Sequence, residues 1–282
     1  MRLASYLWEG RAGYGAVTDA GVVDLTGRLG AAYPDLRALL AHDAVIEAGR
    51  VVAGATPDFA WGAVTPLPVI PNPDKIFCIG LNYDEHRVES GREHTENPTV
   101  FVRFAASQVG AGQPLLRPRE STQFDYEAEI AVIIGKPGRR ISQADAWSHV
   151  AGYACYNDVS VRDWQRHTSQ WTPGKNFPAT GAFGPWMVTA DEIGPGTVMT
   201  LSARLNGREV QRATTEQMIF GIPALISYLS RFTGLAPGDV IVSGTPGGVG
   251  SRREPPLWMK AGDLIEIEID KVGVLRNTIV DE

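Results

Sequence analysis

From residue 76 onward, short apolar runs typical of β-strands follow one another with few helices between them. These runs are Ile76–Gly80, Thr99–Phe104, Glu127–Ile134, Met199–Leu205, Asp239–Ser243 and Asp263–Asp270. One stretch, Thr215–Thr233, has apolar residues at the spacing of an amphipathic helix. Because strands and helices do not alternate regularly, the pattern argues against a doubly wound parallel sheet. It predicts an α+β fold with a dominant β core.

Two local signals add detail to this prediction. Asn206-Gly207 stands between two strand-like runs, and both residue types tolerate the positive φ angles of a two-residue hairpin turn. A short helix is expected to start at Ser142, where Asp145 gives the spacing of a capping box.

A proline-rich passage separates the beginning of the chain from the rest. Its prolines are Pro57, Pro66, Pro68, Pro71 and Pro73, a density that favours an extended connector. The residues before it combine strand-like stretches, Leu3–Trp8 and Tyr14–Thr18, with helical spacing between Leu36 and Val52. We therefore predict a small N-terminal α+β domain, residues 1–70, and a larger domain, residues 71–282.

Charge, hydropathy and cysteine placement limit the possible partners. The net charge of −6 argues against nucleic acid, because phosphate contacts need clustered Lys and Arg. No window approaches the roughly 18 consecutive apolar residues of a membrane span, and the first residues do not resemble a signal peptide. Cys78 and Cys155 each lie in an apolar run. We therefore expect reduced core thiols in a cytoplasmic protein.

Acidic residues stand at the ends of two apolar runs. On a strand, Glu127 and Glu129 point to the same face, where two carboxylates repel each other and need water, a basic partner or a cation. Taken alone, this pair is more typical of a solvent-facing strand edge. Asp158 follows the run Gly152–Tyr156, so its side chain can reach a site beside the sheet. Three carboxylates without nearby Cys or His suit Mg²⁺, Mn²⁺ or Ca²⁺ better than zinc.

A histidine and a glutamate form a second candidate group. If a short helix begins near Asn82 or Asp84, His86 and Glu89 lie at i and i+3 on one face. A carboxylate that fixes a histidine tautomer produces a general base able to activate water near pH 7. An exposed pair without a catalytic role has the same spacing. The polar stretch that follows, residues 87–97, is a candidate lid.

Three more features carry weaker signals. Arg162 lies close enough in sequence to Asp158 to orient an acidic ligand. Lys175 stands among aromatic and turn-forming residues, where it is either a clamp on a developing oxyanion or an ordinary surface lysine. The glycine-rich loop Gly244–Gly250 can cradle a carboxylate or phosphate with its backbone N–H groups, although it matches neither a P-loop nor a dinucleotide fingerprint.

Together these segments resemble the fumarylacetoacetate hydrolase superfamily, in its acylpyruvase-like branch, over about residues 76–280. The motifs, in the family's order and approximate spacing, are IGLNYDEHRVE (79–89), DYEAE (125–129), GYACYNDVSVRDWQ (152–165), Gly174-Lys175, Asn206-Gly207, Gly238-Asp239 and GTPGGVG (244–250). The resemblance implies mixed β-sheets wrapped into a roll, a homodimer, and Mg²⁺ or Mn²⁺ as the metal. Residues 71–282 would be the catalytic domain.

The resemblance also implies roles for single residues. The expected metal ligands are Glu127, Glu129 and Asp158. His86 and Glu89 match the family's catalytic pair, and Lys175 matches its active-site lysine. The expected substrate contacts are Gln165, Thr245 and the loop that begins at Gly244. After the lysine, the chain departs from the commonest Ser-Phe-Asp-Thr run of the family, and its own segment, residues 176–186, is expected to line the pocket.

The leading functional expectation is hydrolytic C–C cleavage in a 1,3-dicarbonyl oxo-acid of acylpyruvate or fumarylacetoacetate type. His86, held by Glu89, would deprotonate the attacking water, and Lys175 with Gln165 would stabilise the oxyanion. The metal would neutralise the enolate leaving group. The alternative is an oxo-acid decarboxylase, isomerase or hydratase with the same metal–enolate site. A metal-stabilised binding protein is a third interpretation, and it leaves His86 and Lys175 without a role.

Overall fold

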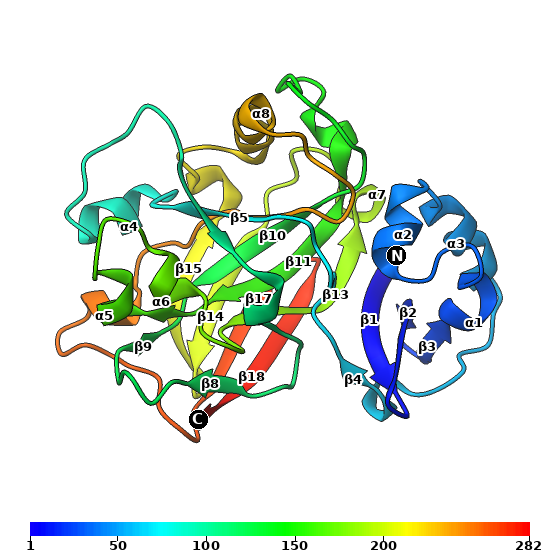
Figure 1. The fold of residues 1–282 in the computed structure, drawn as a ribbon, viewed down its shortest axis with the longest axis horizontal. Helices are drawn as coiled ribbons and strands as arrows, with labels where there is room; N and C mark the ends of the chain where they lie inside the picture. Colours follow the sequence, from blue (N-terminus) through cyan, green and yellow to red (C-terminus); the bar gives the residue numbers. More distant parts are fainter.

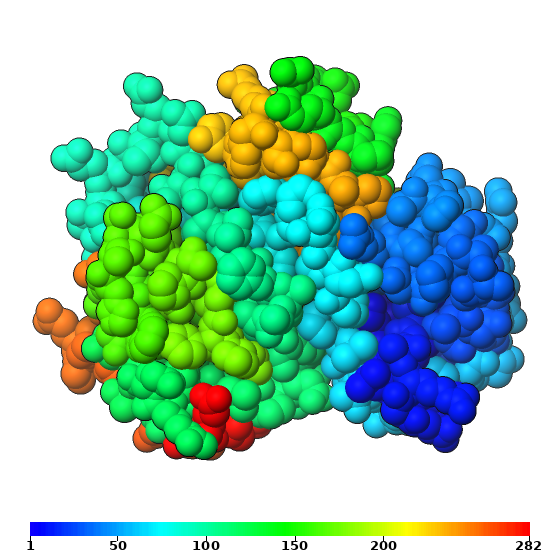
Figure 2. Space-filling view, viewed as in Figure 1, coloured from blue at the N-terminus to red at the C-terminus, as the bar shows by residue number.

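The computed structural model describes residues 1–282 and has two lobes of unequal size (Figure 1). The smaller lobe contains β1 (Arg2–Trp8), β2 (Arg11–Thr18), β3 (Gly21–Asp24), α1 (Thr26–Leu29), α2 (Leu36–Ala41) and α3 (Val45–Val52). The surfaces of the two lobes are in contact on the face shown in Figure 2. Strand β1 pairs with β13 of the larger lobe, so one sheet runs through both.

That sheet is mixed and has eleven strands. Its main path is β3, β2, β1, β13 (Gly181–Thr189), β11 (Val150–Asp158), β10 (Ala128–Ile134), β16 (Val240–Val242), β5 (Ile76–Gly80) and β6 (Thr99–Arg103), with β4 (Thr65–Pro66) on β1 and β7 (Gln108–Val109) on β13. Both edges of β10 are paired, and every residue of that strand is buried, which explains why its sequence is apolar from Ile130 to Ile134.

A second, five-stranded sheet packs against the first. Its order is β15 (Arg208–Thr214), β14 (Thr200–Leu205), β17 (Leu264–Ile269), β18 (Gly273–Asp281) and β8 (Leu115–Arg117), and β9 (Phe124–Asp125) pairs separately with β12 (Ser160–Val161). Apolar residues of both sheets, such as Ile130, Cys155, Leu201 and Ile267, form one core cluster. The remaining helices are α4 (Asp84–Glu89), α5 (Arg162–Gln165), α6 (Thr172–Lys175), α7 (Ala190–Ile193) and α8 (Ile222–Phe232). The predicted α+β class with mixed sheets is confirmed.

The predicted hairpin and the buried cysteines are confirmed as well. Asn206 and Gly207 have φ angles of 52° and 79°, and they connect β14 to β15 as a hairpin. Cys78 and Cys155 are buried and unpaired. No helix is long and apolar enough to cross a membrane.

Two predicted helices have different bounds in the structure. The stretch Thr215–Thr233 divides into a 3₁₀ turn, Thr215–Gln217, and helix α8, because Gly221 and Pro223 begin a new helix rather than continue an old one. The helix expected from Ser142 is a 3₁₀ turn that starts only at Ala146, although the Ser142 hydroxyl does donate to Asp145 Oδ2 at 2.7 Å.

The boundary predicted near residue 70 lies in a tightly packed region. Val69 and Ile70 are fully buried. They belong to a core cluster that also holds Leu3 and Leu39 of the small lobe and Val240 of the larger one. The two lobes therefore share a core, and a division into domains 1–70 and 71–282 stays a prediction.

Candidate active site

The three predicted metal ligands converge at the ends of two neighbouring strands. Glu127 directly precedes β10, Glu129 lies within it, and Asp158 is the last residue of β11. The antiparallel register places Ala128 opposite Asn157, which brings all three carboxylates to the same end of the pair. Their ligand atoms lie within 4.8 Å of one another, and all three side chains are buried. The solvent-facing alternative for these acids is therefore wrong.

Two of the three carboxylates have buried cationic partners. Lys175 Nζ lies 2.7 Å from Glu127 Oε2 and 2.6 Å from Asp158 Oδ2, and Lys175 is only 1% exposed. Burial lowers the pKa of Lys175, but the charges of Asp158 and Glu127 outweigh it, so the pKa is raised. Arg103 pairs with Asp158, and Arg162 Nη2 lies 2.7 Å from Glu127 Oε1. Lys175 is thus part of the acidic site and not a surface residue.

Glu129 is the carboxylate without a cationic partner. Its Oε2 accepts one hydrogen bond, from Gly244 N at 2.5 Å. Burial and the nearby charges of Asp158 and Glu127 raise the pKa of Glu129 well above its usual value. A cation among the three acids would relieve this repulsion, and carboxylate oxygens are the ligands that hard divalent cations prefer. The residues present therefore fit a divalent metal.

The predicted histidine–glutamate pair forms on helix α4. His86 Nδ1 lies 2.7 Å from Glu89 Oε1, and His86 is only 7% exposed. The other oxygen of Glu89 accepts a hydrogen bond from Gly248 N at 2.9 Å. Because Glu89 engages Nδ1, Nε2 is the nitrogen that remains for a reacting group. His86 lines the same cavity as Glu127 and Glu129, so the pair belongs to this site.

The glycine-rich loop uses several of its backbone N–H groups within the chain. The N–H groups of Gly244, Gly248 and Gly250 donate to the chain's own carboxylates, which are Glu129, Glu89 and Asp125 respectively. These three donors therefore hold acidic side chains of the chain itself in place. Gly244 does not line the cavity, and its contact with a substrate stays a prediction. Gln165 and Thr245 line the cavity, and their contact with a substrate stays a prediction as well.

Sequence reasoning missed three buried residues that support the site. Arg103 also donates to the carbonyl of Val159, and it is 2% exposed. Asp125 accepts from Gly250 N and Ser251 N and pairs with Arg162 at 2.7 Å. The side-chain oxygen of Gln211 accepts a hydrogen bond from Ala128 N at 2.9 Å, and its side-chain nitrogen donates to Thr245 Oγ1. The available signals were an arginine inside an apolar run and the first acid of DYEAE.

The segment 176–186, expected to line the pocket, lies elsewhere. None of its residues lines the cavity, and Phe183 is in the core. Asn176 instead joins α6 to the edge strand β6, because its side chain accepts from Phe104 N at 2.7 Å and donates to the carbonyl of Val102 at 3.2 Å. The residue after the lysine therefore anchors Lys175 to the strand that carries Arg103.

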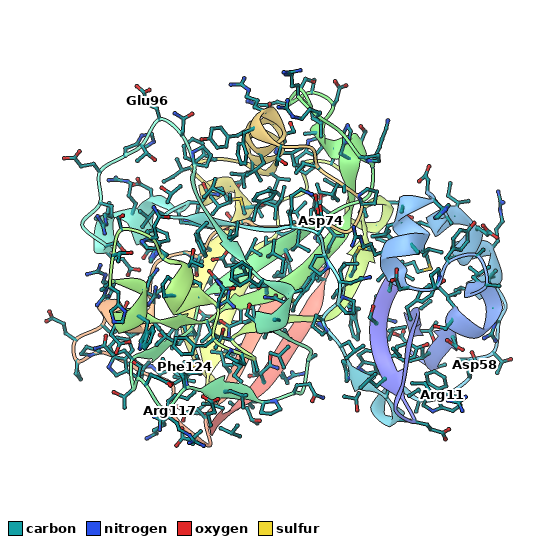
Figure 3. All side chains as sticks on the ribbon, viewed as in Figure 1. Arg11, Asp58, Asp74, Glu96, Arg117 and Phe124 are labelled. Atoms are coloured by element: carbon teal, nitrogen blue, oxygen red, sulfur yellow. The ribbon has the colours of Figure 1, made fainter.

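The site opens outward through two connected spaces. The inner cavity has a volume of about 70 Å³, enough for a few water molecules. An outer vestibule of about 720 Å³ shares several lining residues with it, including Leu81, Gln165 and Trp171. The candidate lid contributes Gly91, Arg92, Glu93 and Thr95 to the vestibule. Figure 3 shows Glu96 at the outer end of this loop. Closure of the loop on a ligand stays a prediction.

Replacing Arg103 with methionine should destabilise the protein by about 3–5 kcal/mol, because it leaves the buried Asp158 without its arginine. Chemical denaturation of both proteins without added metal measures this loss. Arg117→Met is the matched control, since Arg117 pairs with the half-exposed Asp281 and should cost less than about 1 kcal/mol. Equal losses in the two variants would contradict the structural role of Arg103.

The sequence and the fold are similar to those of known proteins. The family described as fumarylacetoacetate (FAA) hydrolase, C-terminal, matches residues 75–280. The chain is 44% identical over 219 residues to a mitochondrial oxaloacetate tautomerase of Xenopus laevis, covering 77% of this chain and 69% of that protein. It is similar to the fumarylacetoacetate hydrolase of Exiguobacterium antarcticum, with 29% identity, TM-score 0.84 and all of both chains covered. It also resembles the maleylpyruvate hydrolase of Sphingobium sp. SYK-6 in complex with manganese(II) and pyruvate, with 28% identity, TM-score 0.83, and 100% and 99% of the chains covered.

Proposed function

The chain belongs to the fumarylacetoacetate hydrolase family, and we propose that it interconverts the keto and enol forms of a small 2-oxo acid. The observation that carries the proposal is the position of His86 and Glu89, an oriented acid–base pair, on the same small cavity as the carboxylate metal site. The first substrate to test is oxaloacetate, because similar proteins with 40–44% identity are named oxaloacetate tautomerases.

The proposed metal is Mg²⁺ or Mn²⁺, held by Glu127, Glu129 and Asp158. When bound, it supplies positive charge beside the oxo oxygen, where negative charge builds as a proton leaves the neighbouring carbon. The manganese in the similar maleylpyruvate hydrolase supports this choice without separating the two metals.

The chain's own residues move the proton. His86 Nε2 removes it from the carbon beside the carbonyl, and the carboxylate of Glu89 stabilises the imidazolium that forms. The same nitrogen returns the proton to the oxygen, which gives the enol, and the reverse order gives the keto form. The ammonium of Lys175 stays between Glu127 and Asp158, where it keeps two of the acids ionised and in place. No water molecule enters this reaction.

Hydrolytic C–C cleavage of an acylpyruvate is the second candidate. The vestibule of about 720 Å³ favours it, because a longer substrate has room to extend outward from the cavity. His86 would then deprotonate a water molecule instead of a substrate carbon. The similarity to a maleylpyruvate hydrolase supports this reaction as well.

One experiment separates the two candidates. The purified protein with Mg²⁺ is mixed with enol-oxaloacetate, and the loss of the enol's ultraviolet absorbance is compared with the uncatalysed rate. In parallel, pyruvate release is measured from a panel of acylpyruvates. We expect fast enol conversion and slow pyruvate release. Faster pyruvate release than enol conversion would favour the hydrolase, and neither activity with Mg²⁺ or Mn²⁺ would refute the proposed function.

A further inference from the structure

Arginines from three separate segments meet where the inner cavity opens into the vestibule. Arg92 follows helix α4, Arg166 ends helix α5, and Arg252 lies in the 3₁₀ turn after the glycine-rich loop. All three line the inner cavity, and Arg92 and Arg166 also line the vestibule. We call these three residues the mouth arginines. Distant parts of the chain thus place cationic groups at one opening.

The mouth arginines have no acidic partner within the chain. None of them takes part in an ion pair, in contrast to Arg162 deeper in the cavity, which pairs with Asp125 and Glu127. The one side-chain contact among them is long, from Arg252 Nη2 to the carbonyl of Ser90 at 3.5 Å. Their guanidinium groups therefore remain available to an anion.

The charges around the opening do not balance. The cavity is lined by five cationic side chains and two acidic ones, and both acids, Glu127 and Glu129, belong to the metal site. Partial burial, together with the charges of Arg162 and Arg252, lowers the pKa of Arg166. A protein with a net charge of −6 therefore concentrates positive charge at this opening, which attracts anionic ligands.

We propose that the mouth arginines, chiefly Arg166 and Arg252, bind a second carboxylate at the far end of the substrate. The inference rests on the proposed function, in which the 2-oxo acid end lies at the metal site. It adds that the enzyme selects dicarboxylic oxo-acids over monocarboxylic ones. Guanidinium groups suit this task because they stay charged and present paired donors to a carboxylate.

A pair of stable probes tests this selectivity without relying on turnover. The first probe, 2-oxoglutarate, and the second, 2-oxopentanoate, have the same chain length and differ in a carboxylate against a methyl group at the far end. Calorimetry on the Mg²⁺-loaded wild type should show at least about tenfold tighter binding of 2-oxoglutarate, because only this probe offers the mouth arginines a charge-assisted hydrogen bond. Equal affinities for the two probes would overturn the proposal.

Substitutions of the mouth arginines test whether these residues cause the preference for 2-oxoglutarate. Arg166→Gln combined with Arg252→Gln should remove the preference for 2-oxoglutarate and leave the affinity for oxalate, which has no distal group, within about twofold of wild type. The control is Arg139→Gln, which removes an exposed arginine that is outside the cavity and has no ion pair; it should keep the preference. A double variant that still prefers 2-oxoglutarate would refute the role of these arginines. Absent tautomerase activity with the preference intact would instead refute only the proposed function.

Discussion

Glu129→Gln should abolish the binding of Mg²⁺ and Mn²⁺ while leaving the protein about as stable as the wild type. Glu129 has no cationic partner, and a glutamine oxygen can still accept the hydrogen bond from Gly244 N. The substitution therefore removes one metal ligand and one repulsive charge without exposing a buried cation. Calorimetric titration with each metal measures the affinity, and chemical denaturation measures the stability.

Asp158→Asn is the informative contrast. It removes a metal ligand too, but it leaves Arg103 and Lys175 without their shared carboxylate. We expect it to lose metal binding and also about 3–5 kcal/mol of stability, the usual effect of breaking a buried ion pair. Wild-type metal affinity in Glu129→Gln would remove that residue from the metal site. A stability loss in Glu129→Gln as large as that in Asp158→Asn would contradict the charge balance described above.

His86→Gln should reduce kcat for enol conversion by about 10²–10⁴-fold, the usual contribution of a positioned acid–base group. Metal affinity should change little, because His86 contributes no oxygen ligand. Glu89→Gln should give a similar loss, since an amide can neither stabilise the imidazolium nor hold the same tautomer. Steady-state kinetics with saturating Mg²⁺, together with metal titration, measures both effects.

The pair of variants also discriminates between mechanisms. A near-normal kcat in His86→Gln would exclude His86 as the proton carrier and would require another base at the cavity. Arg87→Gln is a suitable control, because Arg87 lies on the same helix but its side chain pairs with the exposed Asp84. Arg87→Gln should keep wild-type kcat.

Most residues of the candidate site could be recognised from the sequence, because such polar side chains are unusual next to apolar runs. Two glutamates on one face at the start of an otherwise apolar run repel each other and need water, a basic partner or a cation, which is why Glu127 and Glu129 stood out. The i,i+3 spacing of His86 and Glu89 was a local signal, and the helix that makes it meaningful is formed as expected. Predictions from local spacing of this kind succeed because the spacing depends on few other residues.

The supporting residues were harder to recognise because their roles depend on long-range pairing. In the sequence, Arg103 is a single polar residue at the end of an apolar run. Only the fold, in which β6 carries Arg103 and β11 carries Asp158, brings it to this acid, which is 55 residues away in sequence. The N–H groups of Gly244 and Gly248 suggested an anion cradle, and only the folded loop reveals that Glu129 and Glu89 are the anions. A single sequence does not show which distant residues such contacts join.

Asn176 has a consequence for the behaviour of the protein in concentrated solution. Strand β6 ends the large sheet, and its neighbouring side chains Val102 and Phe104 are 38% and 56% exposed. An apolar terminal strand with free backbone groups recruits strands from other molecules and so promotes aggregation. The amide of Asn176 occupies the carbonyl of Val102 and the N–H of Phe104, the two groups with which an incoming strand would start to pair. The side chain of Asn176, which anchors Lys175, therefore also blocks the pairing of β6 with strands of other molecules.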